Sequence, residues 1–390
     1  MRALVVAPEP FFSPRGTPLS VYYRTEVMAE LGVEVDLLTY GQGEDVEIPG
    51  VRILRIPAFE WLGPVAVGPS LLKLFLDLFL VTRALSLLMR NRYDFIHAHE
   101  ESVFFCRFLK PFFGFKLVYD MHSSLPQQLT NFAFTRSRLL IGLFAKLENS
   151  SLRAADAVIT ISPALADYAR DRMPDADRHF LIENSLIDEV RLKNPGGGAA
   201  TAAEWLRQIP ADRSVVGYAG TFESYQGLDL LLEAFALVRR HRPDAFLLMI
   251  GGSPAQVERH QDLARQQGLA EDALFTGSLA QPEARRLLDR ADVLTSPRRT
   301  GTNTPLKIYA YLASGKPIVA TRIPSHTQLL TEKVCLLADP EPAALADAIL
   351  AAMTSETRQQ TVDAARSFYD ARYSRQAYLA KMRKLLEGLA

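Results

Sequence analysis

Residues 215–231 read VVGYAGTFESYQGLDLL, and they hold the pattern on which the fold depends. The short apolar run Val215–Ala219 ends at a glycine turn, and a helical pattern then runs from Leu228 to Arg240. A buried strand followed directly by a helix is the repeating unit of parallel α/β sheets. The stretch therefore predicts one βα unit.

The same alternation extends from this unit to both ends of the chain. Upstream, strands are expected at Ala3–Ala7, Val33–Thr39, Val51–Ile56, Phe95–Ala98, Phe115–Tyr119, Ala157–Ile161 and Phe180–Ile182. Downstream, they are expected at Phe246–Ile250, Leu274–Thr276, Val293–Ser296, Ile318–Ala320 and Val334–Leu337, with a further helix at Pro282–Arg290. We predict an α/β protein with two doubly wound, Rossmann-like domains that face a cleft, where such sheets bind ligands.

A glycine-rich stretch separates the two series. Residues 193–200 read KNPGGGAA, without apolar periodicity. We expect an N-terminal domain over 1–190, a linker over 191–213 and a C-terminal domain over 214–370. Residues 371–390 are expected to form a helix that packs back toward the N-terminal domain.

The composition excludes several classes of protein. The 390 residues include 44 Lys and Arg against 44 Asp and Glu, so the zero formal charge argues against a dedicated nucleic-acid binder. With 48% hydrophobic residues, disorder is not expected. Two cysteines, Cys106 and Cys335, cannot build a disulfide framework, which fits a reducing cytoplasm.

No segment has the pattern of a signal peptide or a membrane span. The first apolar run stops at Pro8, too early for a signal peptide. The most lipid-like stretch, Leu71–Met89, is interrupted by Lys73, Asp77 and Arg83. A cytoplasmic protein that lies at the inner face of the membrane remains compatible with this pattern.

Two residues of the first half follow predicted strands at their carboxyl ends. Gly16 precedes a helix expected from about Leu19, where backbone N–H groups suit an anion, although an ordinary turn explains it equally well. His122 follows the strand Phe115–Tyr119, where its ring would face a sugar hydroxyl or a phosphate. A structural role for His122 is an equal alternative.

The segment His97, Ala98, His99, Glu100, Glu101 resembles a metal cluster only superficially. It lacks the i, i+4 histidine pair of the H-E-x-x-H motif. We expect no metal here, with His97 packed at the strand end and His99 or Glu100 facing an acceptor.

Residues 296–307 read SPRRTGTNTPLK and form the segment richest in chemistry. Thr304 is the expected N-cap of a helix, so the N–H groups of Leu306 and Lys307 would point outward. Together with Arg298 and Arg299, this arrangement suits a diphosphate, whereas a solvated polar loop is the alternative.

At residues 216–231 and 304–321 the chain resembles the retaining glycosyltransferases of family 4. The resemblance extends over essentially the whole chain and includes residues 155–162 and 182–185. It implies a GT-B fold, with a nucleotide-sugar donor held mainly by the second domain.

The resemblance assigns Gly16, His122 and Gly220, and the residue patterns described above add the other expected site residues. His122, Lys307 and Arg298 are the expected catalytic groups, and His99 and Glu100 the acceptor side. Donor binding is expected from Gly16, Gly220, Thr221, Glu223, Gly252, Arg299, Thr302, Asn303, Thr304 and Leu306.

The sequence departs from the family pattern at four of the positions that carry charge. The family often has an arginine and a lysine where Thr221 and Gln226 stand, and a pair of glutamates where Thr302 and Ala310 stand. Lys307 with Arg298 or Arg299 would replace the lost positive charge.

The implied reaction moves a sugar from a nucleotide diphosphate to a hydroxyl with retention, without a metal or other cofactor. The acceptor would be a saccharide or a lipid-linked glycan of envelope polysaccharide or glycolipid synthesis. A non-catalytic nucleotide-sugar-binding partner protein remains the alternative, since Thr302 and Ala310 lack carboxylates. A nicotinamide oxidoreductase is disfavoured because no G-x-G-x-x-G motif follows the first strand.

Aromatic and basic residues of the first half suit a membrane surface. They are Phe59, Trp61, Leu62, the segment Leu71–Met89, Phe104, Phe105, Arg107, Lys110, Phe112, Phe113 and Lys116. A buried helix with ordinary core aromatics is the alternative.

Overall fold

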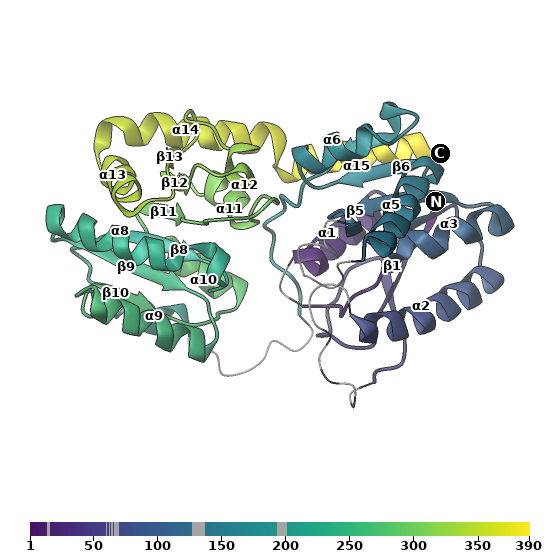
Figure 1. Ribbon diagram of the computed structural model, residues 1–390, viewed down its shortest axis with the longest axis horizontal. Coiled ribbons are helices and arrows are strands. Elements are labelled where there is room, and N and C mark those ends of the chain that lie inside the picture. Colours follow the sequence, from purple (N-terminus) through teal and green to yellow (C-terminus); the bar gives the residue numbers. More distant parts are fainter. Residues whose placement is uncertain are drawn as a thin grey trace. The chain divides into compact units, whose positions relative to one another are not determined.

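The computed structural model describes residues 1–13, 16–59, 61, 63, 65, 70–126, 137–192 and 201–390. The chain divides into two compact units (Figure 1). The first comprises Met1–Leu186, Val190–Pro195 and Arg375–Ala390, and the second comprises Ile187–Glu189 and Gly196–Ser374. Of the predicted linker over 191–213, residues 193–200 lie outside the described residues.

The first unit is built on a parallel sheet with the strand order β3-β2-β1-β4-β5-β6-β7. Its strands are β1 (Arg2–Ala7), β2 (Glu34–Thr39), β3 (Val51–Arg55), β4 (Phe95–His99), β5 (Lys116–Met121), β6 (Ala157–Thr160) and β7 (His179–Leu181). Alternate residues face opposite cores: Ala3 and Val5 pack on one side, Leu4 and Val6 on the other.

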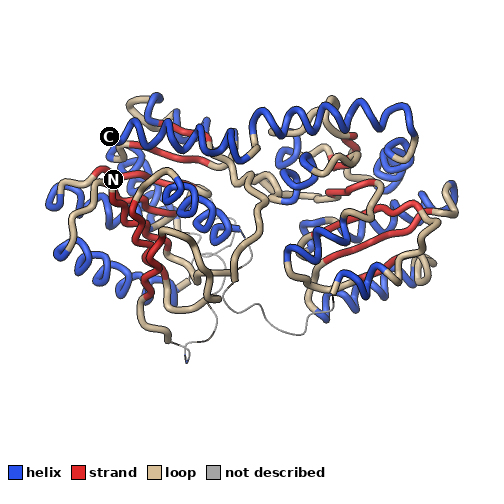
Figure 2. The backbone as a smooth tube through the Cα atoms, turned by 180° about the vertical axis from the view of Figure 1, so that it is seen from behind, coloured by secondary structure: helices blue, strands red, loops and turns tan. Residues whose placement is uncertain are grey.

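Helices cover both faces of this sheet. One face carries α1 (Gly16–Glu30) and the C-terminal helix α15 (Arg375–Leu389). The other carries α2 (Leu71–Arg90), α3 (Ser102–Phe113), α5 (Arg138–Ala154) and α6 (Pro163–Arg170), and the short helix η2 (Ala176–Arg178) precedes β7. Figure 2 shows the strands of each sheet with helices on both sides.

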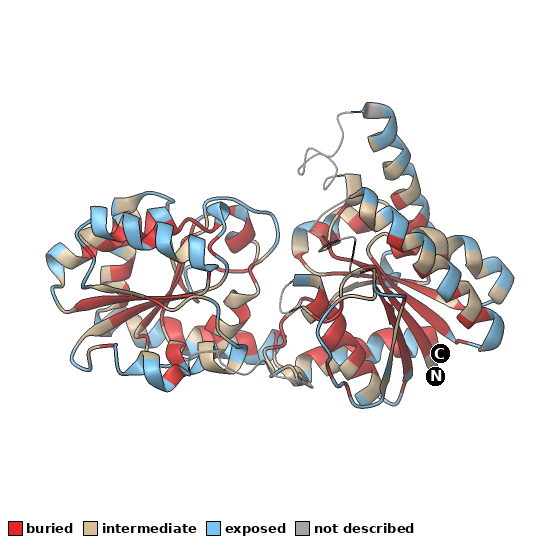
Figure 3. Ribbon diagram, turned by 90° about the horizontal axis from the view of Figure 1, so that it is seen from below, coloured by how far each residue is buried: buried red, intermediate tan, exposed pale blue. Residues whose placement is uncertain are grey.

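The second unit repeats the plan with the strand order β10-β9-β8-β11-β12-β13. Its strands are β8 (Ser214–Ala219), β9 (Ala245–Ile250), β10 (Ala273–Phe275), β11 (Val293–Ser296), β12 (Ile318–Thr321) and β13 (Leu336–Ala338). Buried residues concentrate on the strands and on the helix sides that face them (Figure 3).

The helices of the second unit also form two layers. One layer holds α8 (Leu228–His241), α9 (Pro254–Gln266) and α13 (Pro342–Ala352). The other holds α7 (Ala202–Leu206), α10 (Gln281–Leu288), α11 (Lys307–Ala313) and α14 (Ser355–Arg372), and η3 (Ser224–Gln226) and α12 (Pro324–Thr327) are short connecting turns.

The predicted fold class is confirmed. Each of the thirteen predicted strands is present, and their ends differ from the prediction by no more than two residues. Two helix starts differ from expectation: α1 begins at Gly16 rather than near Leu19, and α11 begins at Lys307 with Leu306 as its N-cap, so Thr304 does not cap it.

The strand order determines where ligands bind in each unit. It reverses at β1, which lies between β2 and β4, and at β8, which lies between β9 and β11. Open α/β sheets bind ligands beyond the carboxyl ends of the strands at such a reversal. The segments after β1 and β4 in the first unit, and after β8 and β11 in the second, therefore lie where such sheets bind ligands.

Candidate functional site

Lys307 occupies the carboxyl edge of the second sheet as the first residue of α11. Its Nζ lies 3.7 Å from the centroid of the Tyr218 ring and 3.4 Å from Oε1 of Gln226, to which it donates. A Cβ atom at Gly220 would lie 2.8 Å from this Nζ. The glycine after β8 therefore leaves the room that the ammonium group occupies.

Arg298 follows β11 and is the second cation of this edge. Its guanidinium donates to the carbonyl oxygen of Asn303 at 3.0 Å and lies 5.1 Å from the centroid of the Tyr225 ring. Over the described residues, neither Arg298 nor Lys307 forms an ion pair with a carboxylate. This pair is an uncompensated concentration of positive charge.

Burial destabilises the charged forms of Lys307 and Arg298. It lowers the pKa of Lys307 well below its usual value, and the positive charge of Arg298 lowers it further. Burial also lowers the pKa of Arg298. A bound dianion would reverse this penalty, which is the electrostatic property of an anion site.

Gln226 stands at one of the two positions where the family pattern carries a cation, and it contacts both the other position, Thr221, and Lys307. Its amide nitrogen donates to Oγ1 of Thr221 at 3.2 Å while its oxygen accepts from Lys307. A neutral amide thus bridges the glycine turn and the lysine. Sequence reasoning did not assign this role to Gln226.

The polar residues expected in the loop before α11 differ in their contacts. Arg299 is exposed and pairs with Asp229 at 3.5 Å, so Arg298 supplies the uncompensated charge. The carbonyl oxygen of Thr302 and Oγ1 of Thr304 both accept from Nε2 of Gln328. Thr304 therefore anchors the loop instead of capping the helix.

The remaining donor-side predictions lie around the glycine turns. Glu223 accepts a hydrogen bond from Gln256 at 3.2 Å and is exposed. Gly252 has φ of +87°, and a Cβ there would lie 2.7 Å from the ring of Phe222. Gly252 is thus required for close packing of the loop after β9.

His326, which the sequence analysis did not single out, lies beneath the Arg298 loop. Its Nε2 is 2.9 Å from Oγ of Ser296 and its Nδ1 is 2.8 Å from the carbonyl oxygen of Thr321. The hydroxyl of Thr321 donates to the carbonyl oxygen of Arg298 at 2.5 Å. Burial lowers the pKa of His326 to about 4, so the ring is neutral and holds this loop by hydrogen bonds.

In the first unit, Gly16 begins α1 with φ of +42°, a left-handed conformation that favours glycine. A side chain at this position would meet no atom within 4 Å. The need for glycine is therefore conformational.

Four polar residues predicted from the sequence come together at the ends of β4 and β5. His97 and His99 are fully buried and His122 is 4% exposed. The nitrogens Nδ1 of His99 and Nε2 of His122 lie 3.2 Å apart. Glu100 follows His99 with φ of +49° and accepts hydrogen bonds from Oγ of Ser123.

These positions separate the roles expected of His99 and Glu100. His99 has no exposed surface, so of the two residues expected on the acceptor side it lies deeper, and its role toward an acceptor stays a prediction. Glu100 is partly exposed at the edge of the sheet. Burial and the neighbouring Glu101 raise the pKa of Glu100 well above its usual value.

Tyr40 and Asp77 extend this edge, and sequence reasoning missed both. The hydroxyl of Tyr40 donates to Oδ1 of Asp77 at 2.6 Å. Burial raises the pKa of Asp77 to about 7, and the charge of Glu101 adds to the effect. Lys73 lies 3.9 Å from Glu101.

The atoms of His97, His99 and Asp120 that could bind a metal lie within 4.8 Å of one another. However, Nε of Arg24 lies 2.5 Å from Oδ2 of Asp120, the oxygen that also lies 2.8 Å from Nε2 of His97. A divalent ion at this oxygen would lie against a guanidinium cation. The three side chains are therefore better placed to form hydrogen bonds with one another than to bind a metal ion.

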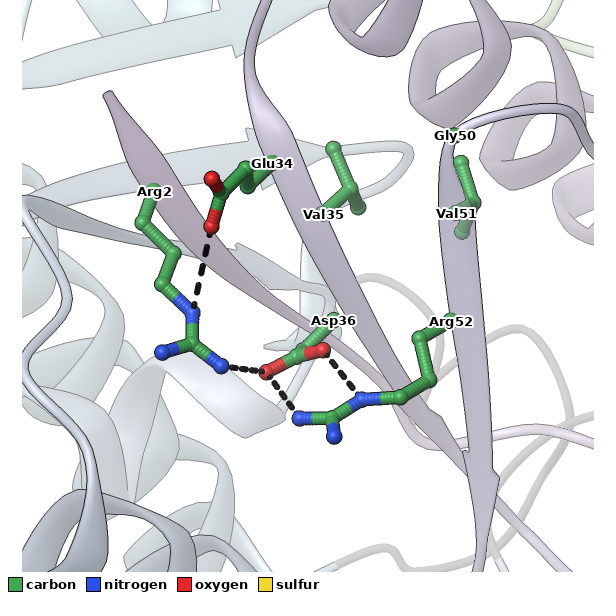
Figure 4. A pocket seen from close by; sticks show the side chains of 7 residues that line it. All are labelled: Arg2, Glu34, Val35, Asp36, Gly50, Val51 and Arg52. Carbon is green, nitrogen blue, oxygen red and sulfur yellow. Dashed lines mark hydrogen bonds and ion pairs between the residues drawn. The ribbon is translucent and has the colours of Figure 1, made fainter.

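A cavity of about 370 Å³ lies at the opposite, amino-terminal edge of the first sheet (Figure 4). Arg2 contacts Glu34 and Asp36, and Arg52 contacts Asp36 through two hydrogen bonds. Because these charges neutralise one another, the cavity has the character of a structural ion-pair cluster.

Helices α2, α3 and α5 expose large apolar side chains, with α3 packed against both of the others. The most exposed are Leu71 at 77%, Phe112 at 82% and Leu139 at 84%. The exposed set comprises Leu71, Leu74, Phe75, Leu78, Met89, Phe108, Phe112, Leu139, Leu140 and Leu143, and Trp61 is also exposed. Leu62 lies outside the described residues.

Three of the basic residues expected beside these apolar side chains already form ion pairs or hydrogen bonds within the protein. Lys110 pairs with Asp156 at 2.7 Å, Lys116 donates to the carbonyl oxygen of Leu389 at 2.7 Å, and Arg107 donates to Ser150. Arg83 and Arg90 of α2 and Lys146 of α5 are exposed cations. Across the described ranges, no helix combines the length and the hydrophobicity that crossing a bilayer would require.

Comparison with known proteins gives consistent matches to both units. Residues 20–185 match the family model described as "Glycosyl transferase 4-like domain", and residues 213–355 match "Glycosyl transferases group 1". The two models together cover most of the chain and most of both sheets.

Three known proteins illustrate the similarity. A D-inositol 3-phosphate glycosyltransferase of Corynebacterium urealyticum is 26% identical over 91% of this chain and 87% of its own length. A phosphatidyl-myo-inositol mannosyltransferase of Mycobacterium leprae is 23% identical over 100% of this chain and 97% of its own. The structure of Anabaena HepE in complex with UDP superposes with a TM-score of 0.72 at 16% identity, covering 99% of this chain and 100% of the other.

Proposed function

Because the chain belongs to the family 4 glycosyltransferases and has their GT-B fold, we propose that it transfers a sugar from a nucleotide diphosphate to a hydroxyl with retention of configuration. One observation carries this proposal: Arg298 and Lys307 gather at the carboxyl edge of the second sheet without a carboxylate partner among the described residues. A diphosphate supplies the missing negative charge.

The two cations act on the leaving group. In the transfer, the bond between the anomeric carbon and the diphosphate oxygen breaks, a bond between that carbon and the acceptor oxygen forms, and the proton of the acceptor hydroxyl passes to the leaving diphosphate. Negative charge grows on the diphosphate, and fixed donors in a site of low polarity stabilise that charge most in the transition state. Tyr218, Gln226 and Gly220 hold Lys307 where it can do so.

We assign the acceptor to the first unit at the edge that carries Glu100. UDP is the nucleotide with the most direct support, because the similar HepE structure holds it. The mannosyltransferase relative is named for a lipid acceptor, which supports a lipid-linked or saccharide acceptor for this chain.

The same proposal places the protein at the inner face of a membrane. The exposed apolar residues of α2, α3 and α5 provide the area that enters the interface, and Arg83, Arg90 and Lys146 provide attraction to anionic lipid.

The test is a panel of nucleotide sugars offered to the purified protein, with release of nucleoside diphosphate as the readout. UDP-glucose is the first donor, and GDP-mannose and UDP-N-acetylglucosamine follow. Release that depends on an added acceptor, with a retained anomer in the product by NMR, supports the proposal. Binding of donors without release under all acceptors would instead favour the non-catalytic partner, which Thr302 and Ala310 keep as the second candidate.

A further inference from the structure

Five side chains that carry or gain charge are buried together at the carboxyl end of the first sheet. Arg24 of α1, His97 and His99 of β4, and Asp120 of β5 are 0% exposed, and His122 is 4% exposed. The Cα atoms of His99 and Asp120 are register partners in neighbouring strands. His97, two residues before His99, therefore faces the same side of the sheet.

Asp120 lies at the centre of this group. Its Oδ2 is 2.5 Å from Nε of Arg24 and 2.8 Å from Nε2 of His97, and its Oδ1 is 3.2 Å from Nε2 of His122. Burial alone would raise the pKa of Asp120, but the charge of Arg24 and the neighbouring histidines hold it well below its usual value. Asp120 is thus an anion that can only accept hydrogen bonds.

Arg24 is itself fixed by two further contacts. One guanidinium nitrogen donates to the hydroxyl of Tyr378 at 3.1 Å, and another donates to the carbonyl oxygen of Ile182 at 2.8 Å. Tyr378 lies on α15 and is buried in the core beside α1. The C-terminal helix therefore supports the cation that keeps Asp120 ionised and in place.

The ionised carboxylate restricts where the hydrogens of the rings lie. Nε2 of His97 must carry a hydrogen, because its partner oxygen only accepts. Between His99 Nδ1 and His122 Nε2, one nitrogen donates and the other accepts. Nε2 of His122 is 3.2 Å from Oδ1 of Asp120, a buried oxygen without a hydrogen-bond partner in the described part of the chain. Nδ1 of His99 is 3.6 Å from Oδ2, which Arg24 and His97 already contact, so the attraction of the carboxylate favours the hydrogen on His122.

We propose that Asp120, held by Arg24, is a positioning residue that fixes His122 in the tautomer with its hydrogen on Nε2, so that Nδ1 is the acceptor nitrogen of that ring. Only the role of His122 toward the transferred sugar rests on the proposed function. The tautomer is a property of the free protein.

The chain suits a direct measurement because it has seven histidines. Two-bond and three-bond correlations between ring protons and ¹⁵N in histidine-labelled protein report the tautomer of each ring, and single His→Gln variants assign the signals. At neutral pH we expect His97, His99 and His122 all to carry hydrogen on Nε2. A hydrogen on Nδ1 of His122 in the wild-type protein would overturn the proposal.

Asp120→Asn tests the cause. If the amide oxygen stays toward Arg24 and His97, its NH2 group faces His122 and donates to Nε2, which moves the hydrogen of His122 to Nδ1. We expect that switch while His97 stays unchanged, and a fall in kcat of at least tenfold with a KM for the donor within about threefold of wild type. Unchanged tautomers in a folded Asp120→Asn protein would refute the role of Asp120.

Thr160→Val is the matched control, because the hydroxyl of Thr160 lies 2.8 Å from Nε2 of a different buried histidine, His179. It should alter the signals of His179 and leave those of His122 in place. If Asp120→Asn does not fold, the wild-type spectrum still decides the tautomer. A failed donor screen with the expected tautomer would reject the proposed function and not this assignment.

Discussion

Lys307 illustrates how one residue can concentrate the chemistry of a site. It lies against the face of Tyr218, beside Gly220 and Arg298, in a place where its charge lacks a carboxylate partner in the described part of the chain. A buried ammonium group without a carboxylate partner is expected to stabilise negative charge that develops on a bound substrate.

Lys307→Ala should slow transfer strongly. Loss of one donor to the leaving diphosphate raises the barrier by about 2–4 kcal/mol, which is a fall in kcat of about 30-fold to 1,000-fold. Steady-state kinetics with the donor found in the panel measure it. Lys333→Ala, an exposed lysine of the same unit, is the control and should keep full activity. Wild-type turnover in folded Lys307→Ala would remove the assignment.

The carboxyl group of Asp77 should make the stability of the protein depend on pH. Its pKa rises from 3.8 to about 7 on folding, chiefly by burial. The folded state therefore binds more protons between these values, and stability falls as pH rises through that window, by up to about 4 kcal/mol. Asp77→Asn keeps an acceptor for Tyr40 but cannot titrate, so it should be more stable than wild type above pH 7 and similar near pH 4.

Urea unfolding of both proteins from pH 4 to pH 8 checks the prediction for Asp77. Parallel pH profiles for the two proteins would show that Asp77 is ionised in the folded state without penalty.

Among the elements, α2 combines two faces with different surroundings. Leu76, Leu80, Ala84, Leu87 and Leu88 are buried against the sheet. Leu71, Leu74 and Leu78 are exposed to solvent, and their spacing places them on one stripe of the helix. One face of α2 is therefore buried, as the buried-helix alternative expects, and the other face is exposed, while its contact with a membrane stays a proposal.

We expect the exposed face of α2 to bind anionic vesicles. Leu74→Ser with Leu78→Ser should weaken sedimentation with vesicles that contain phosphatidylglycerol at least fivefold, and raised salt should weaken wild-type binding because the attraction is screened within about 8–10 Å. Leu206→Ser, on α7 of the second unit, is the control for loss of an exposed leucine. If the protein bound neither anionic nor neutral vesicles, an acceptor that is not embedded in a membrane would be favoured.

The last helix of the chain, α15, follows the second unit in sequence but belongs to the first unit. On α15, Tyr378, Met382, Leu385, Leu386 and Leu389 are buried in the core of the first sheet. Arg375 pairs with Glu26 and Glu30 of α1, and Lys381 pairs with Glu183.

Truncation after Ser374 should therefore destabilise the first unit and spare the second. Hydrogen exchange followed by mass spectrometry should show loss of protection in β1 and α1, because their apolar partners on α15 are gone, with β8 and α8 unchanged. Wild-type protection in β1 and α1 of the truncated protein would contradict the prediction.

Metal chelation tests the electrostatics of the whole molecule. Because Arg298 and Lys307 supply fixed positive charge for the diphosphate, EDTA should leave at least about half of the transfer rate. Complete inhibition that added Mg²⁺ or Mn²⁺ reverses would show that a metal carries this charge instead.

The strands, their parallel arrangement and the loop with Arg298 and Lys307 could all be predicted from the amino-acid sequence. Strand and helix periods are local, since each depends on residues within a few positions, and parallel strands bring their carboxyl ends to one edge. For the same reason, the sequence predicted that Gly220 and the cations of residues 298–307 lie at that edge. The helix start at Lys307 was missed, and the contact that the hydroxyl of Thr304 makes instead of a cap is to Gln328, 24 residues later, which no local pattern records.

Which charged side chains have partners depends on contacts between distant parts of the folded chain. Arg299 pairs with Asp229 while its neighbour Arg298 does not, and His99 is buried while Glu100 reaches the surface. Arg24 and Tyr378 lie 354 positions apart and meet in one buried network. Desolvation and ion pairing depend on every group within a few ångströms, and those groups come from distant parts of the chain, so no local pattern records them.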